Sequence, residues 1–280
     1  MKVSRESLRL RITGAHEHSI LLALAPYYEQ ANVYNAFNVN VHYTGPDTTG
    51  GADINWTMTN IGVSTIWCPS DPDVQEMRRL TYWLGSQGGF PMRYTSYKGN
   101  AGPWPTPARS TDPADAIFGA QKSNALGLFY YYSSTKLSDI RDGTSNTLMF
   151  GETAYGLLDE GSKVEWHWWT SGNYGDTMFT TYYPLNPHRK LANGTSVGVN
   201  TSVFVVTASS LHPGGANFCM ADGSVRFIKD TVNTWPHNSN GSPTAVTASN
   251  GVFTVGPPGF GVYQALSTRK GGEVISADQY

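Results

Sequence analysis

The sequence predicts an α+β fold, made mostly of antiparallel β-sheet with one N-terminal helix and long loops. The chain of 280 residues is low in charge (14%) and contains 16 Tyr and 8 Trp, a composition typical of β-rich proteins. Residues 26–37, PYYEQANVYNAF, place apolar side chains at helical spacing. Residues 216–229 surround an Asp-Gly pair with strand-like residues, which is the strongest short signal for a β-hairpin.

The organisation predicted from the sequence is one domain, because no change in composition marks a linker. Residues 1–18 form a basic, polar leader, and residues 19–280 form a single globular head that ends in a hairpin region at 205–280. The net charge of −2 provides no basic surface, so nucleic acid is not an expected partner. The apolar run at 20–30 is short and contains Pro26, so it cannot span a bilayer, and no secretion signal is visible at Met1.

Several further elements are expected along the chain. The helix at 26–37 begins at Pro26, because proline suits the first turn of a helix. A short strand ended by a Pro-rich turn is expected at 63–73, and another strand at 164–172. Residues 127–152 are expected to form a strand, a short helical turn and a second strand.

The hairpin pattern also predicts a register. A two-residue type I′ loop at Asp222–Gly223 pairs Phe218 with Phe227 across the two strands. Because side chains alternate between the faces of a strand, one apolar face is expected to point into the core. The residues of that face are Phe218, Met220, Val225 and Phe227.

His212 precedes Gly214 and Gly215 on the loop that enters this hairpin, ten residues before Asp222. A functional interpretation makes His212 and Asp222 metal ligands or an acid/base pair of a hydrolase. One His and one Asp are too few, since a zinc site needs at least three protein ligands. The favoured interpretation is structural, with the imidazole bonded to loop backbone or to the turn aspartate. No catalytic residue, metal or cofactor is therefore expected.

A second Asp-Gly pair opens the stretch DGTSNTLMFGE. It predicts a turn at Asp142–Gly143, in which Ser145 and Asn146 bond local backbone, followed by a buried strand that ends at Glu152. Leu148 and Phe150 are expected to share the buried face of that strand. A hydrolase interpretation would make Ser145 or Glu152 catalytic, but no G-x-S-x-G pattern surrounds Ser145.

The chain has two cysteines, Cys68 and Cys219, which could form a disulfide in an oxidising compartment or remain unrelated thiols. Cys68 lies in WCPSDPD, where the second cysteine of a C-x-x-C redox pair is absent, and no calcium-loop pattern follows the aspartates.

The stretch EWHWW at 165–169 places Trp166 and Trp168 on one face of an expected strand. An exposed pair of this kind could stack on sugar rings, and a buried pair would be part of the core. The first alternative makes the protein a binding module for glycans or another small solute.

Taken in order, several motifs resemble those of a large bacterial family, abundant in planctomycetes, of prepilin-type proteins with a C-terminal H-x9-D-G domain. These motifs are LLALAPYYEQANVYNAFN, WCPSD, YKGNAG, LSDIRDGTSNTLMFGE, LHPGGANFCMADGSVRF and LSTRKGGEVIS. His212, Asp222 and Gly223 occupy the positions that name the H-x9-D-G domain. The family's central domain has no assigned function and has also been labelled a solute-binding domain.

The resemblance implies the globular head of a pseudopilin-like protein. Family members begin with a pilin-type leader and a long apolar helix that anchors or assembles the protein, and residues 1–18 match neither. The implied function is a non-enzymatic structural or adhesive component of a type II secretion or type IV pilus-like assembly in the cell envelope. The implied partners are other pseudopilin-like or envelope proteins, with a membrane contacted only through such an anchor helix.

Overall fold

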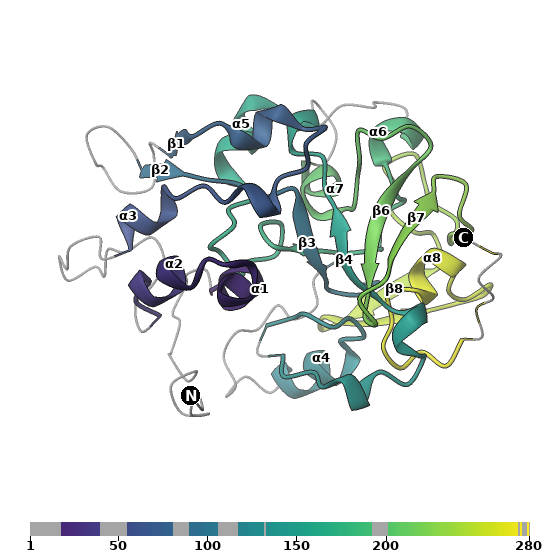
Figure 1. The fold of residues 1–280 in the computed structure, drawn as a ribbon. Helices are drawn as coiled ribbons and strands as arrows, with labels where there is room; N and C mark the ends of the chain where they lie inside the picture. The colour runs from purple at the N-terminus through teal and green to yellow at the C-terminus, as the bar shows by residue number, and fades with distance from the viewer. Residues whose placement is uncertain are drawn as a thin grey trace.

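The computed structural model describes residues 18–39, 55–80, 90–105, 117–131, 133–191, 201–273, 275 and 279. A five-stranded sheet in the order β5-β3-β4-β6-β7 lies at its centre (Figure 1). Its strands are β3 Tyr97–Asn100, β4 Leu148–Glu152, β5 Met178–Phe179, β6 Gly215–Met220 and β7 Val225–Lys229. β5 pairs with β3 in parallel, and the other neighbours are antiparallel. The predicted α+β fold with a mostly antiparallel sheet is confirmed.

Short elements surround this sheet (Figure 1). Two antiparallel pairs join β1 Arg78–Leu80 to β2 Phe90–Met92, and β8 Val246–Ser249 to β9 Val252–Val255. The helices are α1 Ile20–Leu24, α2 Ala31–Ala36, α3 Trp56–Thr59, α4 Phe118–Asn124, α5 Glu160–Glu165, α6 Pro187–Lys190, α7 Thr201–Val206 and α8 Val262–Ala265. Among the described residues, none of the helices combines the length and the apolar character needed to cross a membrane.

The predicted β6–β7 hairpin is present, but its register differs from the prediction by one residue. Phe218 faces Arg226 and Cys219 faces Val225. The Met220 N–H donates to the carbonyl of Ser224, and Gly223 has a φ of 86°. The loop therefore has three residues, 221–223, with glycine in the left-handed position that such loops require.

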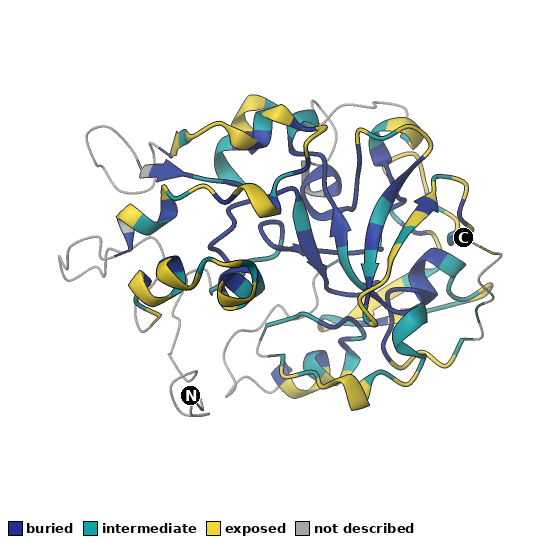
Figure 2. Ribbon diagram, viewed as in Figure 1, coloured by how far each residue is buried: buried dark blue, intermediate teal, exposed yellow. Residues whose placement is uncertain are grey.

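This difference moves the side chains of β7 to the opposite face, because the side-chain period of a strand is two. Val225 and Phe227, predicted to lie in the core, are 68% and 44% exposed. Ile228 takes the inward position beside Phe218 and Met220, and all three are buried. In Figure 2 exposed residues accordingly appear along β7, while β3, β4 and β6 are mainly buried or intermediate.

β4 contains an irregularity that the alternation rule does not anticipate. Leu148 pairs with Met220 and Phe150 pairs with Cys219, so the register shifts between Leu148 and Phe150. Leu148 lies in the core, whereas Phe150 is half-buried. The prediction that these two side chains share one buried face is therefore wrong, because a β-bulge adds a residue to one strand.

The core consists of three clusters of buried side chains. The largest joins α1, α2 and α7 to Tyr94, Tyr155 and Trp169. The second covers one face of the central sheet with Phe179, Phe218 and other apolar side chains. The third is a small aromatic group of Trp104, Trp235 and Phe253 beside β9.

The helix expected at 26–37 is divided into two short pieces. A 3-10 helix spans Ala25–Tyr28, and α2 begins at Ala31. Glu29 between them has a φ of 65°, and the Gln30 N–H donates back to the carbonyl of Ala25. A left-handed residue of this kind ends a helix, so the apolar spacing continues across a break in the helix.

The strands expected at 63–73 and 164–172 are absent from the described residues. Residues 63–73 instead contain a 3-10 helix at Ser64–Ile66, and the backbone beyond it bonds to side chains such as Ser96. The stretch before EWHWW forms α5, because the Asp159 side chain accepts from the Ser162 N–H and caps the helix. Among the residues of 127–152 that the structure describes, β4 is the one strand, preceded by 3-10 helices at Leu137–Asp139 and Thr144–Asn146.

Candidate functional site

Three side chains from separate motifs meet beside the end of β4. The sulfur of Cys68 lies 3.8 Å from Nε2 of His212, and Oε1 of Glu152 lies 3.5 Å from the same nitrogen. These three donor atoms all lie within 4.8 Å of one another. The cluster of Cys68, Glu152 and His212 is the one group of at least three such side chains found among the described residues.

Glu152 is held by the neighbouring strand β6. Its Oε2 accepts from the backbone N–H of Asn217 at 2.8 Å, and its Oε1 accepts from the Asn217 side-chain amide at 3.0 Å. The carboxylate side chain is only 5% exposed. Two hydrogen bonds to one residue fix the orientation of the carboxylate and turn Oε1 toward His212.

His212 is fixed through its backbone. Its N–H donates to Oγ of Ser210, and its carbonyl accepts from the Arg189 guanidinium at 2.7 Å. Arg189 is in turn paired with Asp230 at 2.8 Å. The imidazole remains about one third exposed, so solvent reaches the cluster from this side.

Cys68 lies at the start of the loop that follows the 3-10 helix Ser64–Ile66. Its backbone N–H donates to Oγ of Ser96, and its side chain is buried. Three residues further on, the buried carboxylate of Asp71 accepts from the Gly156 N–H through both oxygens and so fixes the loop. Burial raises the pKa of the Asp71 carboxyl. The sulfur therefore faces His212 from a restrained backbone.

The geometry argues against a nucleophilic relay of the Cys-His-acid type. In such a relay the nucleophile faces one ring nitrogen and the acid orients the other. Here Cys68 and Glu152 both face Nε2 of His212, and one nitrogen cannot accept from the thiol while donating to the carboxylate. Three different donor atoms that converge on one point are instead the arrangement in which proteins hold a divalent metal ion.

Tyr97 forms part of the surroundings of this cluster. It pairs with Glu152 across β3 and β4. Burial, reinforced by the nearby Cys68 and Glu152, raises the pKa of its phenol to about 12. The Tyr97 hydroxyl therefore stays protonated at neutral pH.

Asp222, the expected partner of His212, does not take part in the cluster. Its carboxylate accepts from the N–H and hydroxyl of Ser224 within its own turn, and it is exposed. These hydrogen bonds lower the pKa of the Asp222 carboxyl. The expectation that the imidazole bonds loop backbone or Asp222 is corrected: a cysteine and a glutamate stand beside Nε2.

The residues of the other predicted motifs have structural contacts. Asp142 accepts from the hydroxyl of Thr268 and from the N–H groups of Gly271 and Gly272, so it holds the C-terminal segment against its turn. Gly143 has a φ of 91°, and Ser145 and Asn146 lie in the 3-10 helix that follows it.

Gly214 and Gly215, which follow His212, are glycines for different reasons. Gly214 has a φ of 81°, in the left-handed region. A Cβ at Gly215 would stand 2.2 Å from the carbonyl oxygen of Ile228, so only glycine fits there.

The two cysteines are free thiols in the structure. Cys68 faces His212, and Cys219 donates to the carbonyl of Met220 in β6. The disulfide that the sequence allowed is therefore not formed, and each sulfur has its own surroundings.

Trp166 and Trp168 do not form an exposed surface. Trp168 is 2% exposed, and Trp166 is partly buried against the largest core cluster. His167 between them has a φ of 68°, which interrupts the extended backbone that the prediction required. The hypothesis of a sugar-stacking surface at these residues is corrected for that reason.

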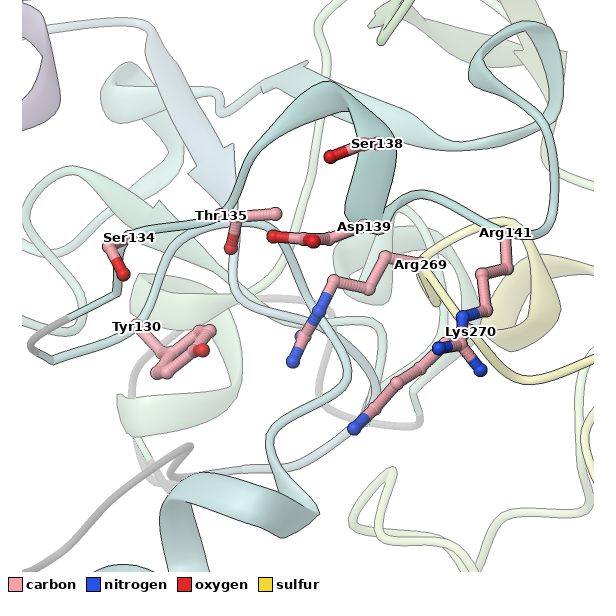
Figure 3. A pocket seen from close by; sticks show the side chains of 8 residues that line it. All are labelled: Tyr130, Ser134, Thr135, Ser138, Asp139, Arg141, Arg269 and Lys270. Atoms are coloured by element: carbon pink, nitrogen blue, oxygen red, sulfur yellow. The ribbon is translucent and has the colours of Figure 1, made fainter.

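A second feature is a polar hollow of about 340 Å³ beside the C-terminal segment (Figure 3). Arg141, Arg269 and Lys270 contribute cationic side chains to it, and Asp139 contributes a carboxylate. The guanidinium of Arg269 donates to the carbonyls of Ala125 and Gly127, so it also holds the wall of the hollow together. Positive charge exceeds negative charge in this lining.

Sequence reasoning identified Cys68, Glu152 and His212 individually, but not as a group. Cys68 and His212 are 144 residues apart, and Glu152 belongs to a third motif. No local spacing joins the three, because the strand order of the central sheet brings them together. Cys68 and His212 each precede turn-forming residues, PSDPD and PGG, and Glu152 ends a strand, but these local signals do not join the three.

Comparison with known proteins gives one positive result. No curated protein and no solved structure matches the chain. A family model described as "Protein of unknown function (DUF1559)" matches residues 4–234, and this range extends into the stretch 1–18 that the quoted motifs leave uncovered. The match covers most of the sequence, and the chain therefore belongs to the DUF1559 family.

Proposed function

We propose that the protein is the globular head of a pseudopilin-like assembly in the cell envelope, with a structural or adhesive role and no enzymatic activity. The motifs that resemble the prepilin-type family support this function, and five of the six lie within residues 4–234, which the DUF1559 model matches. A contact surface on the head supports its place in a secretion-type or pilus-like assembly.

That surface is the outer face of the β6–β7 hairpin. Val225 and Phe227 are 68% and 44% exposed, and Asn217 and Cys219 lie opposite them on β6. β7 is also an edge strand of the central sheet. Large apolar side chains on an exposed edge strand mark an interaction site, because monomeric proteins usually protect such edges with charge or cover.

The partner that we propose for this face is a neighbouring pseudopilin-like subunit. Buried polar and charged side chains on the other face of the sheet hold the head itself together, whereas Val225 and Phe227 of β7 stay exposed on the outer face. Lys98 illustrates this internal role, since its ammonium donates to the carbonyls of Gly175 and Val205 inside the molecule.

The test is site-specific photo-crosslinking in the cells that make the protein. A photoreactive amino acid in place of Phe227 is expected to give a crosslink to a pseudopilin-like subunit, identified by mass spectrometry, in the envelope fraction. The matched control is the same amino acid at Leu137, which is 67% exposed outside the sheet, and it is expected to give no such product. Recovery in the cytoplasmic fraction, or equal products from both positions, contradicts the proposal.

The polar hollow favours a second candidate function, which is the binding of a small anionic solute. Arg141 and Lys270 line it on one side and Ser134 on the other (Figure 3). Calorimetric titration with anionic sugars and small carboxylates tests it. Saturable heat that Lys270→Gln and Arg141→Gln each weaken at least tenfold supports this function, and no heat from any ligand removes it.

A further inference from the structure

We propose that Cys68, Glu152 and His212 form a binding site for a divalent transition-metal ion, with zinc as the best-matched ion. The site has one thiolate, one carboxylate and one imidazole ligand, and its fourth position is open to solvent on the side of His212. This site goes beyond the assembly function, because its ligands are Cys68, Glu152 and His212, whereas the candidate contact is made by Val225 and Phe227 on the same outer face of the sheet.

Two of the three distances between donor atoms are close to those that such an ion requires, and all three lie within 4.8 Å. Zinc bonds of about 2.0–2.3 Å in tetrahedral geometry separate neighbouring ligand atoms by about 3.3–3.6 Å. The sulfur of Cys68 is 3.8 Å from Nε2 of His212, and Oε1 of Glu152 is 3.5 Å from it. Movements of a few tenths of an ångström in these side chains bring these two pairs to the tetrahedral distances.

The buried carboxylate of Glu152 is a second, independent argument for a metal ion at this site. Its side chain is 5% exposed, and a buried carboxylate needs a cation or a metal ion as partner. Among the described residues, no Lys or Arg forms an ion pair with Glu152, and His212 is the one basic group beside it. A bound divalent ion would neutralise both the carboxylate and a Cys68 thiolate, which a singly charged imidazolium cannot do.

The ligand set also selects the class of ion. Thiolate and imidazole ligands together favour zinc and similar borderline-soft ions over magnesium and calcium, which prefer oxygen ligands. Because the site has three protein ligands, a water molecule would complete a four-coordinate ion.

Residues outside the ligand set orient the ligands before an ion binds. Asn217 orients Glu152 through two hydrogen bonds, and Arg189 and Ser210 hold the backbone of His212. Partners of this kind fix ligand geometry, and their loss lowers metal affinity by about 10–100-fold. Asn217 is therefore a positioning residue for the site, and loss of a ligand is expected to have a larger effect.

The experiment is a Co²⁺ titration of the tag-free, chelator-treated protein, followed by displacement with Zn²⁺. We expect a saturable, equimolar signal with the sulfur-to-cobalt charge-transfer absorption of a thiolate ligand and the visible bands of four-coordinate cobalt. Added Zn²⁺ is expected to remove both. Absence of equimolar binding, or a cobalt spectrum without the thiolate absorption, overturns the proposal.

Matched variants assign the ligands. Cys68→Ser and His212→Gln are each expected to reduce zinc affinity by more than about 100-fold, whereas Asn217→Ala reduces it by about 10–100-fold. Cys219→Ser, which removes the other free thiol, is the control and should leave affinity unchanged. If Cys68→Ser binds zinc as the unaltered protein does, the site is wrong.

A measurement on the unaltered protein keeps the proposal testable if a variant fails to fold. Zinc is expected to slow alkylation of Cys68 at least tenfold while the alkylation of Cys219 stays constant in the same sample. Equal rates at Cys68 with and without zinc overturn the proposal, because a coordinated thiolate is not available to the reagent.

Discussion

On the two faces of the central sheet, neighbouring residues have different roles. On the inner face, Phe218 and Ile228 pack into a core cluster. On the outer face of the same two strands, Asn217 orients Glu152, and Phe227 is 44% exposed. One strand pair thus supplies both a packed core and the surface that carries the candidate metal site and the candidate contact.

The buried charged groups on the two faces also differ in their partners. Lys98 on β3 is fully buried, and burial lowers the pKa of its ammonium well below the usual value. Its donors are nevertheless satisfied by internal carbonyls. Glu152 on the outer face keeps an oxygen beside His212 and Cys68. The difference indicates that the donors of Lys98 are satisfied within the chain, whereas the Glu152 oxygen faces the point at which we propose a metal ion.

The largest expected effect separates the two faces of the hairpin directly. Phe218→Ala removes a buried ring that contacts Phe179 and Tyr263, so it should lower the free energy of unfolding by about 3–5 kcal/mol. Phe227→Ala, on the outer face, should cost about 1 kcal/mol or less. Urea unfolding of both variants measures the difference. Equal losses would show that the outer face is packed against another part of the chain.

The existence of this hairpin could be predicted from the sequence, but its register could not. Asp-Gly occurs both in two-residue loops and in three-residue loops with a left-handed glycine. The choice between them depends on contacts outside the hairpin, since the N–H groups of Ala221 and Asp222 donate to the carbonyls of Thr147 and Thr144. A distant turn therefore decides which face of the sheet Phe227 occupies.

The candidate site shows a similar limit. Each of its ligands lies in a recognisable motif, but sequence spacing predicts metal sites only when ligands share a helix, a turn or a knuckle. Here the pairing of β4 with β6 places Glu152 beside Asn217, and the loops carrying Cys68 and His212 then converge on it. The error at EWHWW had a readable signal, because Asp159 with a helix-forming run after it is a helix start.

The second prediction concerns Asp176, a buried carboxyl whose pKa the charge of Lys98 affects. Burial raises the pKa of the Asp176 carboxyl from 3.8 to about 7, and the hydroxyl of Ser171 and the charge of Lys98 oppose the rise. Between these two values the folded protein holds a proton that the unfolded chain releases. The contribution of Asp176 to the free energy of unfolding should therefore be greatest below pH 4. It should fall as pH rises toward 7, by at most about 1.4 kcal/mol per pH unit.

Asp176→Asn is expected to remove this fall, because the amide does not titrate. The matched control is Asp222→Asn, since the depressed pKa of Asp222 places its contribution at lower pH. Thermal unfolding from pH 4 to 7 measures both variants. If the stability of Asp176→Asn still falls as pH rises, another group is responsible for the titration, and the contrast between the faces is weaker.

The smallest expected effect tests the loop that sets the register of the two faces. Gly223 has a φ of 86°, and a Cβ built there meets no atom within 4 Å, so a substitution acts through the backbone alone. Gly223→Ala should cost about 1–2 kcal/mol, and Gly223→Asn less, because asparagine visits the left-handed region more readily. Urea unfolding of both variants supplies the comparison. If asparagine were worse than alanine, the glycine would not be held in the left-handed conformation, and the three-residue loop could not be what turns Phe227 outward.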